Sequence, residues 1–280
     1  MLNLISLQDA LIQIKKLIEE AIATEGEGGK RSVINSGKPI GMLHDVVKSA
    51  LIRNGVNAQL IKPALGATRG ELKLAGFLKL KKQDICVLPN HLAPHEEVID
   101  FNGILRNFRD PYGELFTEHI LTINVRSQLS SIEKNIDTMY ERTYAEPMNL
   151  HRRLPKMVLG EVYLIALRAY DSDKVKKKRI AYTRPSERTQ KYLEKYILGF
   201  SALNSRTGQG DDYFKYERVA LILVDFSQAI PKVYKDVAGL KEDRLLPTSI
   251  VASMQGLSFD SFVEDLLIIY ERRFGTNKLS

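Results

Sequence analysis

Polar side chains stand at two points of the chain where strands are expected, and their types suit phosphodiester chemistry. Asp84 begins the predicted strand 84–88, Asn124 lies near the end of another, 119–125, and Arg126 directly follows that strand. Residues at i and i+2 of a strand point to the same face, so Asn124 and Arg126 should share a surface. Phosphodiester cleavage uses a divalent cation held by carboxylates, which polarises the phosphate and activates water. The pattern therefore indicates a metal-dependent nuclease.

The elements that must position these side chains alternate between helices and strands. Apolar residues at helical spacing predict helices over 7–23, 42–51, 132–143 (capped by Ser130 or Ser131), 187–200 and 259–274. Strand patterns cover 72–77, 84–88, 119–125, 158–167 and 219–224, with the first two as neighbouring strands. The glycines between residues 25 and 39 predict a flexible loop, and 89–111 should be irregular.

This alternation predicts an α/β fold in which helices flank a mixed β-sheet. Because no Pro/Gly/Ser-rich linker divides the chain, we expect one domain of residues 1–280. Its predicted parts are an N-terminal helical part of about 1–60, a catalytic core of about 61–230 and a C-terminal helical part of about 231–280.

Composition excludes several classes of protein. With 44% hydrophobic and 27% charged residues, the 280-residue chain should fold around a sizeable core. The single cysteine, Cys86, excludes a disulfide framework and is expected to be a buried small hydrophobe in a reducing cytoplasm. Charges interrupt the apolar stretch 2–22, which argues against a signal peptide or a membrane span. The five histidines show no metal-binding spacing.

The charge balance favours an anionic partner. Lys and Arg number 41 against 34 Asp and Glu, and nucleic acid is the commonest partner of a soluble basic protein. The glycine-rich segment lacks the Gly-Lys-Ser/Thr ending of a phosphate-binding loop, so ATP binding is not expected. The basic run 174–179 fits a phosphate contact and a solvated loop equally well.

Several short stretches in this order resemble the PD-(D/E)XK nuclease superfamily, and within it the type II restriction endonucleases of the XhoI kind. The matching stretches are Gly29-Lys30-Arg31-Ser32-Val33, Gly37-Lys38, Leu74-Ala75-Gly76-Phe77, Asp84 and Asn124-Val125-Arg126-Ser127-Gln128, within residues 28–150. The resemblance implies a restriction-endonuclease-like core, Mg²⁺ as cofactor and double-stranded DNA as substrate. It also implies a homodimer and a companion DNA methyltransferase that protects the host's own sites.

The chain departs from that family at two positions. Asn124 stands where the family has glutamate, and Arg126 where it has lysine. An amide is a poor ligand for a divalent cation, and a guanidinium stays protonated. Relatives sometimes supply the second carboxylate from the following helix, where Glu146 is favoured over Glu141.

On this basis the resemblance suggests a role for each candidate residue. Asp84 and Glu146 would bind the metal, with the Val125 carbonyl as a further ligand and Asn124 holding a bound water. Arg126, Gln128 and Lys134 would meet the phosphate, and Lys134 would replace the missing amine. The candidate DNA-binding residues are Arg31, Ser32, Lys38, Lys177 and Lys178.

Other interpretations of the same residues stay open. Asp84 could pair with one of the lysines at 79, 81 and 82, and Glu71-Leu72-Lys73 with Asp45 offers a second acid-x-lysine assignment. Two functional alternatives also remain. The chain could be a catalytically weakened DNA-binding relative of the family, or an unrelated α/β protein that binds a different acidic partner.

Overall fold

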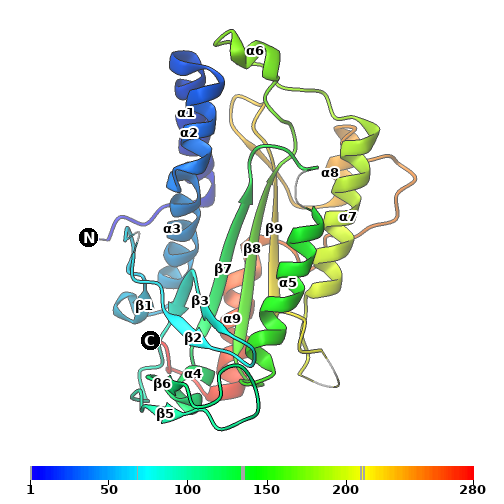
Figure 1. Cartoon of the computed structure of the whole chain (residues 1–280). Helices are drawn as coiled ribbons and strands as arrows, with labels where there is room; N and C mark the ends of the chain where they lie inside the picture. The colour runs from blue at the N-terminus through cyan, green and yellow to red at the C-terminus, as the bar shows by residue number, and fades with distance from the viewer. Residues whose placement is uncertain (1, 68, 134–135, 209, 211) are drawn as a thin grey trace.

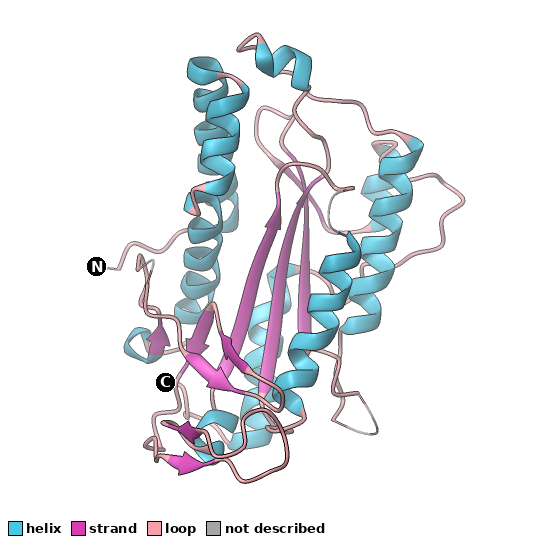
Figure 2. Cartoon of the chain, in the orientation of Figure 1, coloured by secondary structure: helices cyan, strands magenta, loops and turns pink. Residues whose placement is uncertain are grey.

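Three parallel strands rich in Val, Ile and Leu form the centre of the molecule. They are β7 (Leu121–Gln128), β8 (Val158–Ala166) and β9 (Arg218–Asp225), and β8 is buried at every position. Strands covered on both faces lose the alternation of polar and apolar residues. The computed structural model describes residues 2–67, 69–133, 136–208, 210 and 212–280, and Figure 2 shows the strands between two sets of helices.

Short antiparallel strands extend this sheet on both sides. They are β4 (Ile85–Val87), β1 (Ile61–Lys62) and β10 (Lys232–Tyr234), which give the order β1-β4-β7-β8-β9-β10. Because β4 runs antiparallel to β7 while β8 runs parallel to it, the sheet is mixed. The predicted α/β class with a mixed sheet flanked by helices is thereby confirmed.

Helices cover the two faces of the sheet in separate layers (Figure 1). One layer contains α1 (Leu7–Glu25), α3 (Lys38–Arg53) and α9 (Phe259–Phe274), and the other contains α5 (Ile136–His151) and α7 (Glu187–Leu203). Ile123 and Val125 of β7 pack into the first layer. Since side chains alternate along a strand, Asn124 and Arg126 face the α5 side.

The remaining elements are short. They are α2 (Glu27–Asn35), η1 (Ala58–Leu60), β2 (Lys73–Ala75), β3 (Leu80–Lys82), β5 (Glu97–Val98), β6 (Arg109–Asp110), α4 (Glu114–Glu118), α6 (Ser172–Lys176) and α8 (Val237–Glu242). In the described part of the chain, no helix has the length and apolar character needed to cross a membrane.

The predicted loop at 25–39 is wrong, because most of it forms α2. Two glycines inside this helix made it look irregular, but one of them lets it pack closely on α1. A Cβ at Gly29 would lie 2.3 Å from the Ala21 carbonyl oxygen, so only glycine permits this approach. Tertiary packing therefore outweighs the low helix propensity of glycine.

Two further predictions about local structure need correction. The segments 72–77 and 84–88 are not neighbouring strands, because β2 pairs with β3 in a separate hairpin while β4 joins the main sheet. A hairpin with a short turn closes at small entropic cost, which favours the local partner. The helix predicted over 132–143 runs instead from Ile136 to His151, as α5.

Candidate functional site

A cleft of about 730 Å³ opens between the end of β7, the residue before β4, the β2–β3 hairpin and α5. Asp84, Arg126, Gln128 and Glu146 line it, together with Lys81. Four of the sequence-predicted site residues thus meet in one cleft although they come from three separate segments. Strand alternation and the packing of α5 over β7 bring them together.

Asp84 directly precedes β4, whose first residue, Ile85, pairs with Ile123 of β7. Its Oδ2 atom accepts a hydrogen bond of 2.9 Å from the backbone N–H of Val125. This contact fixes the aspartate against β7 and turns it toward the cleft that Arg126 also lines. The Val125 side chain packs into the opposite face of the sheet.

Glu146 projects from the buried side of α5 into the cleft. Both of its carboxylate oxygens are engaged: Lys81 Nζ donates to one and Arg126 Nη2 to the other. Glu141, the alternative carboxylate, is exposed and borders a smaller neighbouring cleft of about 250 Å³. Of the two glutamates, only Glu146 is therefore close to Arg126.

Arg126 bridges two acids from different elements. Besides Glu146, it meets Glu161 of β8, whose Oε1 lies 2.9 Å from Arg126 Nε. Burial would lower the pKa of Arg126, but Glu161 and Glu146 raise it well above its usual range. The guanidinium is therefore a fixed positive charge between the side chains of Glu146 and Glu161.

Glu161 is a residue of this cluster that the sequence analysis missed. It lies directly across from Asn124 in the pairing of β7 with β8, and it is completely buried. Burial and the charges of Glu146 and Asp84 outweigh the attraction of Arg126 and raise the pKa of Glu161 to about 8. One signal was present in the sequence: Glu161 is the single charge in a segment otherwise typical of a fully buried strand.

Lys81 is the second residue that the sequence did not single out. The sequence suggested it only as one of three possible partners of Asp84, but the β2–β3 hairpin carries it to Glu146, while Lys82 pairs with Glu71. Asn149 of α5 holds this hairpin in place, because its Oδ1 accepts from the N–H groups of Leu78 (2.8 Å) and Lys79 (3.0 Å). A Cβ at the adjacent Gly76 would lie 2.2 Å from the Asn149 side chain, so the close approach requires glycine there.

The other predicted site residues have different surroundings. Asn124 is buried and is not among the residues that line the cleft. Gln128 lines it, and its Nε2 donates to the Ser131 carbonyl. Lys134 lies outside the described residues.

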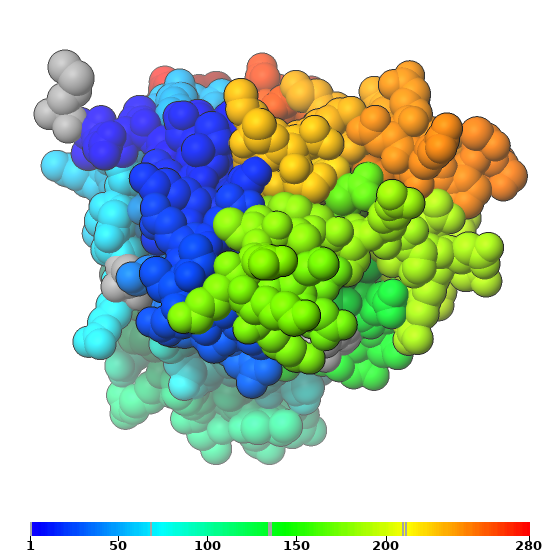
Figure 3. Space-filling view, turned by 90° about the horizontal axis from the view of Figure 1, so that it is seen from above, coloured from blue at the N-terminus to red at the C-terminus, as the bar shows by residue number. Residues whose placement is uncertain are grey.

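The five candidate DNA-binding residues are all exposed and lie on neighbouring helices. Arg31 and Ser32 belong to α2, Lys38 begins α3, and Lys177 and Lys178 directly follow α6. Elements α2 and α6 contact each other, and the view from above in Figure 3 shows the two segments side by side. The basic rim, as we call these five residues, thus lies on adjoining segments, and none of its side chains lines the main cleft.

The residues of the second acid-x-lysine assignment, Asp45 and Glu71, lie outside the main cleft. Asp45 accepts from Lys48 Nζ at 3.3 Å and from the N–H of Gly66 at 3.0 Å. Glu71 lies 3.6 Å from Lys82 and, like Asp45, lines a cavity of about 600 Å³ beside α3. Asp45 thus supports a loop, and the Glu71 carboxylate pairs with a surface lysine.

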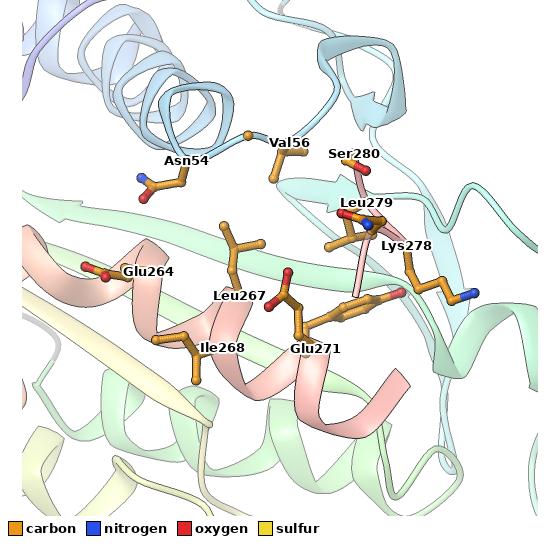
Figure 4. A pocket seen from close by; sticks show the side chains of 12 residues that line it. Asn54, Val56, Glu264, Leu267, Ile268, Glu271, Lys278, Leu279 and Ser280 are labelled. Carbon is orange, nitrogen blue, oxygen red and sulfur yellow. The ribbon is translucent and has the colours of Figure 1, made fainter. Parts of the chain in front are cut away.

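Another cavity, of about 340 Å³, lies between the end of α3, α9 and the segment 277–280 (Figure 4). Leu279 is buried there, and its carbonyl accepts from the N–H of Asn57 at 3.0 Å. The acids along this cavity, Glu264 and Glu271, both come from α9. None of the described residues that were predicted for chemistry lines this cavity.

Two residues that line the main cleft, Asp84 and Glu146, offer carboxylate oxygens of the kind that a hard divalent cation prefers. Within the described ranges, however, no three His, Cys, Asp or Glu side chains are arranged so that they could hold a metal ion. Arg126 lies between Glu146 and Glu161 and pairs with both. The acids fit such an ion in kind, while the guanidinium takes the position between two of them.

Comparison with known proteins finds no family model, no curated protein and no solved structure that matches this chain.

Proposed function

We propose that this chain is a magnesium-dependent endonuclease that hydrolyses double-stranded DNA, of the type II restriction kind, with a PD-(D/E)XK-like core. The observation that carries the proposal is the convergence of Asp84, Arg126 and Glu146 in one cleft. The secondary-structure elements that carry these residues also suit such a core. The antiparallel strand β4, the strand β7, the helix α5 and the parallel strand β8 occur in this order along the chain.

Each cleft residue has a part in the proposed reaction. Asp84 and Glu146 are the residues that would hold the cation, which supplies polarisation of the phosphate and activation of water. Arg126 would bind the scissile phosphate through its planar fork of N–H donors. Lys81 would also orient a water there, the role proposed for Lys134, because its ammonium already contacts Glu146.

The basic rim would hold the DNA backbone. Arg31, Lys38 and Lys177 are exposed cations, and contacts of this kind supply affinity without sequence specificity. Cutting both strands of a symmetric site would require a homodimer, which sedimentation velocity can test. A companion DNA methyltransferase and a cytoplasmic location belong to the same proposal.

One observation favours a second candidate, a DNA-binding relative with weakened cleavage. The Arg126 guanidinium is paired with two glutamates, and Asn124 offers no charge to a cation. In that case recognition would persist while hydrolysis was slow or lost.

Plasmid DNA incubated with the purified protein, with and without Mg²⁺, separates these candidates. Discrete fragments that require Mg²⁺ support the endonuclease, and tight sequence-selective binding without fragments supports the weakened relative. Salt-sensitive binding without selectivity would contradict both.

Variants test the residue assignments within the proposal. Asp84→Ala should abolish cutting and leave most of the DNA affinity, because removing a carboxylate does not weaken attraction to a polyanion. Glu146→Ala should also abolish cutting, with Glu141→Ala as the matched control on the same helix. Full activity of Glu146→Ala together with an inactive Glu141→Ala would reverse that assignment.

A further inference from the structure

Aromatic and basic side chains lie together on the outer side of α5. Tyr144 belongs to this helix, and Arg152 directly follows it. The N–H of Arg152 still donates to the Met148 carbonyl at 3.2 Å, as in a helix, so Tyr144 and Arg152 lie on nearly the same side, about 12 Å apart along the axis. Both side chains are exposed, Tyr144 to 49%.

Neighbouring rings hold both of these exposed groups in place. Tyr144 stacks on Phe214, with ring centroids 5.1 Å apart and ring planes at 20°. The guanidinium carbon of Arg152 lies 5.5 Å from the centroid of the Phe77 ring and 5.6 Å from that of Tyr213. Such contacts restrict the side chains before a partner binds, which lowers the entropy lost on binding.

The charge around these rings is mostly positive. Glu141 is an exposed acid of the same helix, but the cations outnumber it. In the described part of the chain, none of these cations forms an ion pair, so their charge is available to an anionic partner. They come from the hairpin, from α5 and its end, and from the segment before β9, where the last lies 5.9 Å from the Phe214 ring: Lys79, Arg142, Arg152 and Lys215.

A groove joins this surface to the main cleft. The smaller cleft of about 250 Å³ lies between the β2–β3 hairpin and α5. Lys79 and Arg142 line both clefts, and Tyr144 follows Arg142 by two positions. A polyanionic strand that leaves the main cleft would therefore meet these cations first and the tyrosine ring next.

We propose that Arg142, Tyr144, Arg152 and Lys215 form a stacking surface that binds single-stranded DNA, with a base on Tyr144 and phosphates on the cations. Aromatic rings beside cations bind unpaired strands because every base has a flat face and every nucleotide a phosphate. In a duplex the bases cover each other's faces, so Tyr144 cannot stack on them. The choice of DNA rests on the proposed function, because the surface adjoins the cleft assigned to DNA cleavage.

Fluorescence anisotropy of a labelled oligothymidylate of about 12 nucleotides, in EDTA, tests the stacking surface without cleavage. Tyr144→Ala should weaken this binding at least about fivefold, because a stacked base is lost, and should leave the affinity for a duplex unchanged. The variant should fold, since the side chain is half exposed and alanine favours a helix.

The matched control is Tyr192→Ala on α7. The Tyr192 ring also has two cations beside it, Arg188 at 5.7 Å and Lys195 at 5.5 Å. This control should bind oligothymidylate like the wild type, and a loss as large as that of Tyr144→Ala would contradict the proposed location.

Three other results overturn the proposal. They are equal oligothymidylate affinities of Tyr144→Ala and the wild type, an equal loss of duplex affinity in that variant, and wild-type protein that binds no oligothymidylate. Tighter binding of oligouridylate than of oligothymidylate would overturn the choice of DNA.

If circular dichroism shows Tyr144→Ala to be unfolded, Lys215→Gln replaces it. This variant should reduce the slope of log affinity against log salt by about 0.7, as expected when one phosphate contact to a single strand is lost. An unchanged slope overturns the proposal.

The stacking surface and the endonuclease fail separately. Uncut plasmid together with weakened oligothymidylate binding in Tyr144→Ala contradicts only the endonuclease. Cut plasmid together with unchanged binding in that variant contradicts only the stacking surface.

Discussion

Two glutamates, Glu161 in β8 and Glu217 just before β9, are both completely buried, but their surroundings differ. Glu217 accepts from the Leu159 N–H (2.8 Å), Arg206 (3.0 Å) and Arg273 (2.7 Å), and His151 Nε2 lies 3.4 Å away. Glu161 has Arg126 as its cation. The carboxylate of Glu217 is thus held on several sides, whereas Glu161 has one cation nearby and shares it with Glu146.

The pKa values of the two side chains express the same contrast. Burial alone would raise the pKa of Glu217, but His151, Arg273 and Arg206 outweigh it and lower the pKa to about 2. For Glu161 burial prevails, and the pKa rises to about 8. Equal burial thus gives opposite shifts, because the number of donors and cations decides which charge state is stabilised.

The largest expected effect concerns stability. Glu217→Gln should lower the free energy of unfolding by about 3–5 kcal/mol, since it leaves the buried Arg206 and the half-buried Arg273 without their carboxylate. Glu161→Gln should cost less than about 1 kcal/mol at pH 8, because the amide avoids burying a charge and Arg126 keeps Glu146. Urea unfolding measures both, and equal losses would break the comparison.

Activity should show the opposite order. Glu161→Gln should slow plasmid cleavage by about 10- to 100-fold at saturating Mg²⁺, because Arg126 loses the buried partner that orients it beside Glu146. Glu217→Gln should cut at a rate close to the wild type at a temperature where it stays folded. A strong loss in Glu217→Gln and none in Glu161→Gln would mean that the scaffold and site roles are exchanged.

The two glutamates should contribute to the stability of the protein in different pH ranges. The raised pKa of Glu161 means that its contribution is complete below about pH 4.3, the unfolded value, and is lost as pH rises through about 8. The lowered pKa of Glu217 means that its contribution is present above about pH 4.3 and is lost as pH falls through about 2.

Urea unfolding across a pH series tests this prediction with changes on the order of 1 kcal/mol. In Glu161→Gln the free energy of unfolding should change less with pH between the unfolded-state pKa of glutamate and pH 8. In Glu217→Gln it should change less at acid pH. An unchanged upper window in Glu161→Gln would contradict the assignment.

The smallest expected effect concerns the last turns of α5, which support the surroundings of Glu217 as well as those of the cleft. His151 faces Glu217, while Asn149 holds the hairpin that carries Lys81. Asn149→Ala should cost about 1 kcal/mol and speed amide exchange at residues 78 and 79, because their acceptor is lost. Asn204→Ala removes another buried amide, which accepts from the Val219 N–H at 2.8 Å, and should leave that exchange unchanged.

Much of the secondary structure could be predicted because it follows local patterns. The bounds of α9 agree with the prediction, and α3 ends at the expected Asn54-Gly55 stop signal. The loop predicted in place of α2 shows the limit of such patterns. Gly28 and Gly29 would weaken an isolated helix. Only the packing of α2 on α1 shows that Gly29 is needed for the close approach of the two helices and not for a flexible loop.

For the cleft, the sequence by itself determined that Asp84 begins a strand and that Asn124 and Arg126 share a face, because strand geometry depends only on neighbours in the chain. It also favoured Glu146 over Glu141 as the acid near Arg126. Only the tertiary structure decided that Lys81 reaches Glu146 and that Glu161 lies across from Asn124. Strand order and hairpin packing set these distances, and both depend on contacts between residues far apart in the chain, which no local spacing encodes.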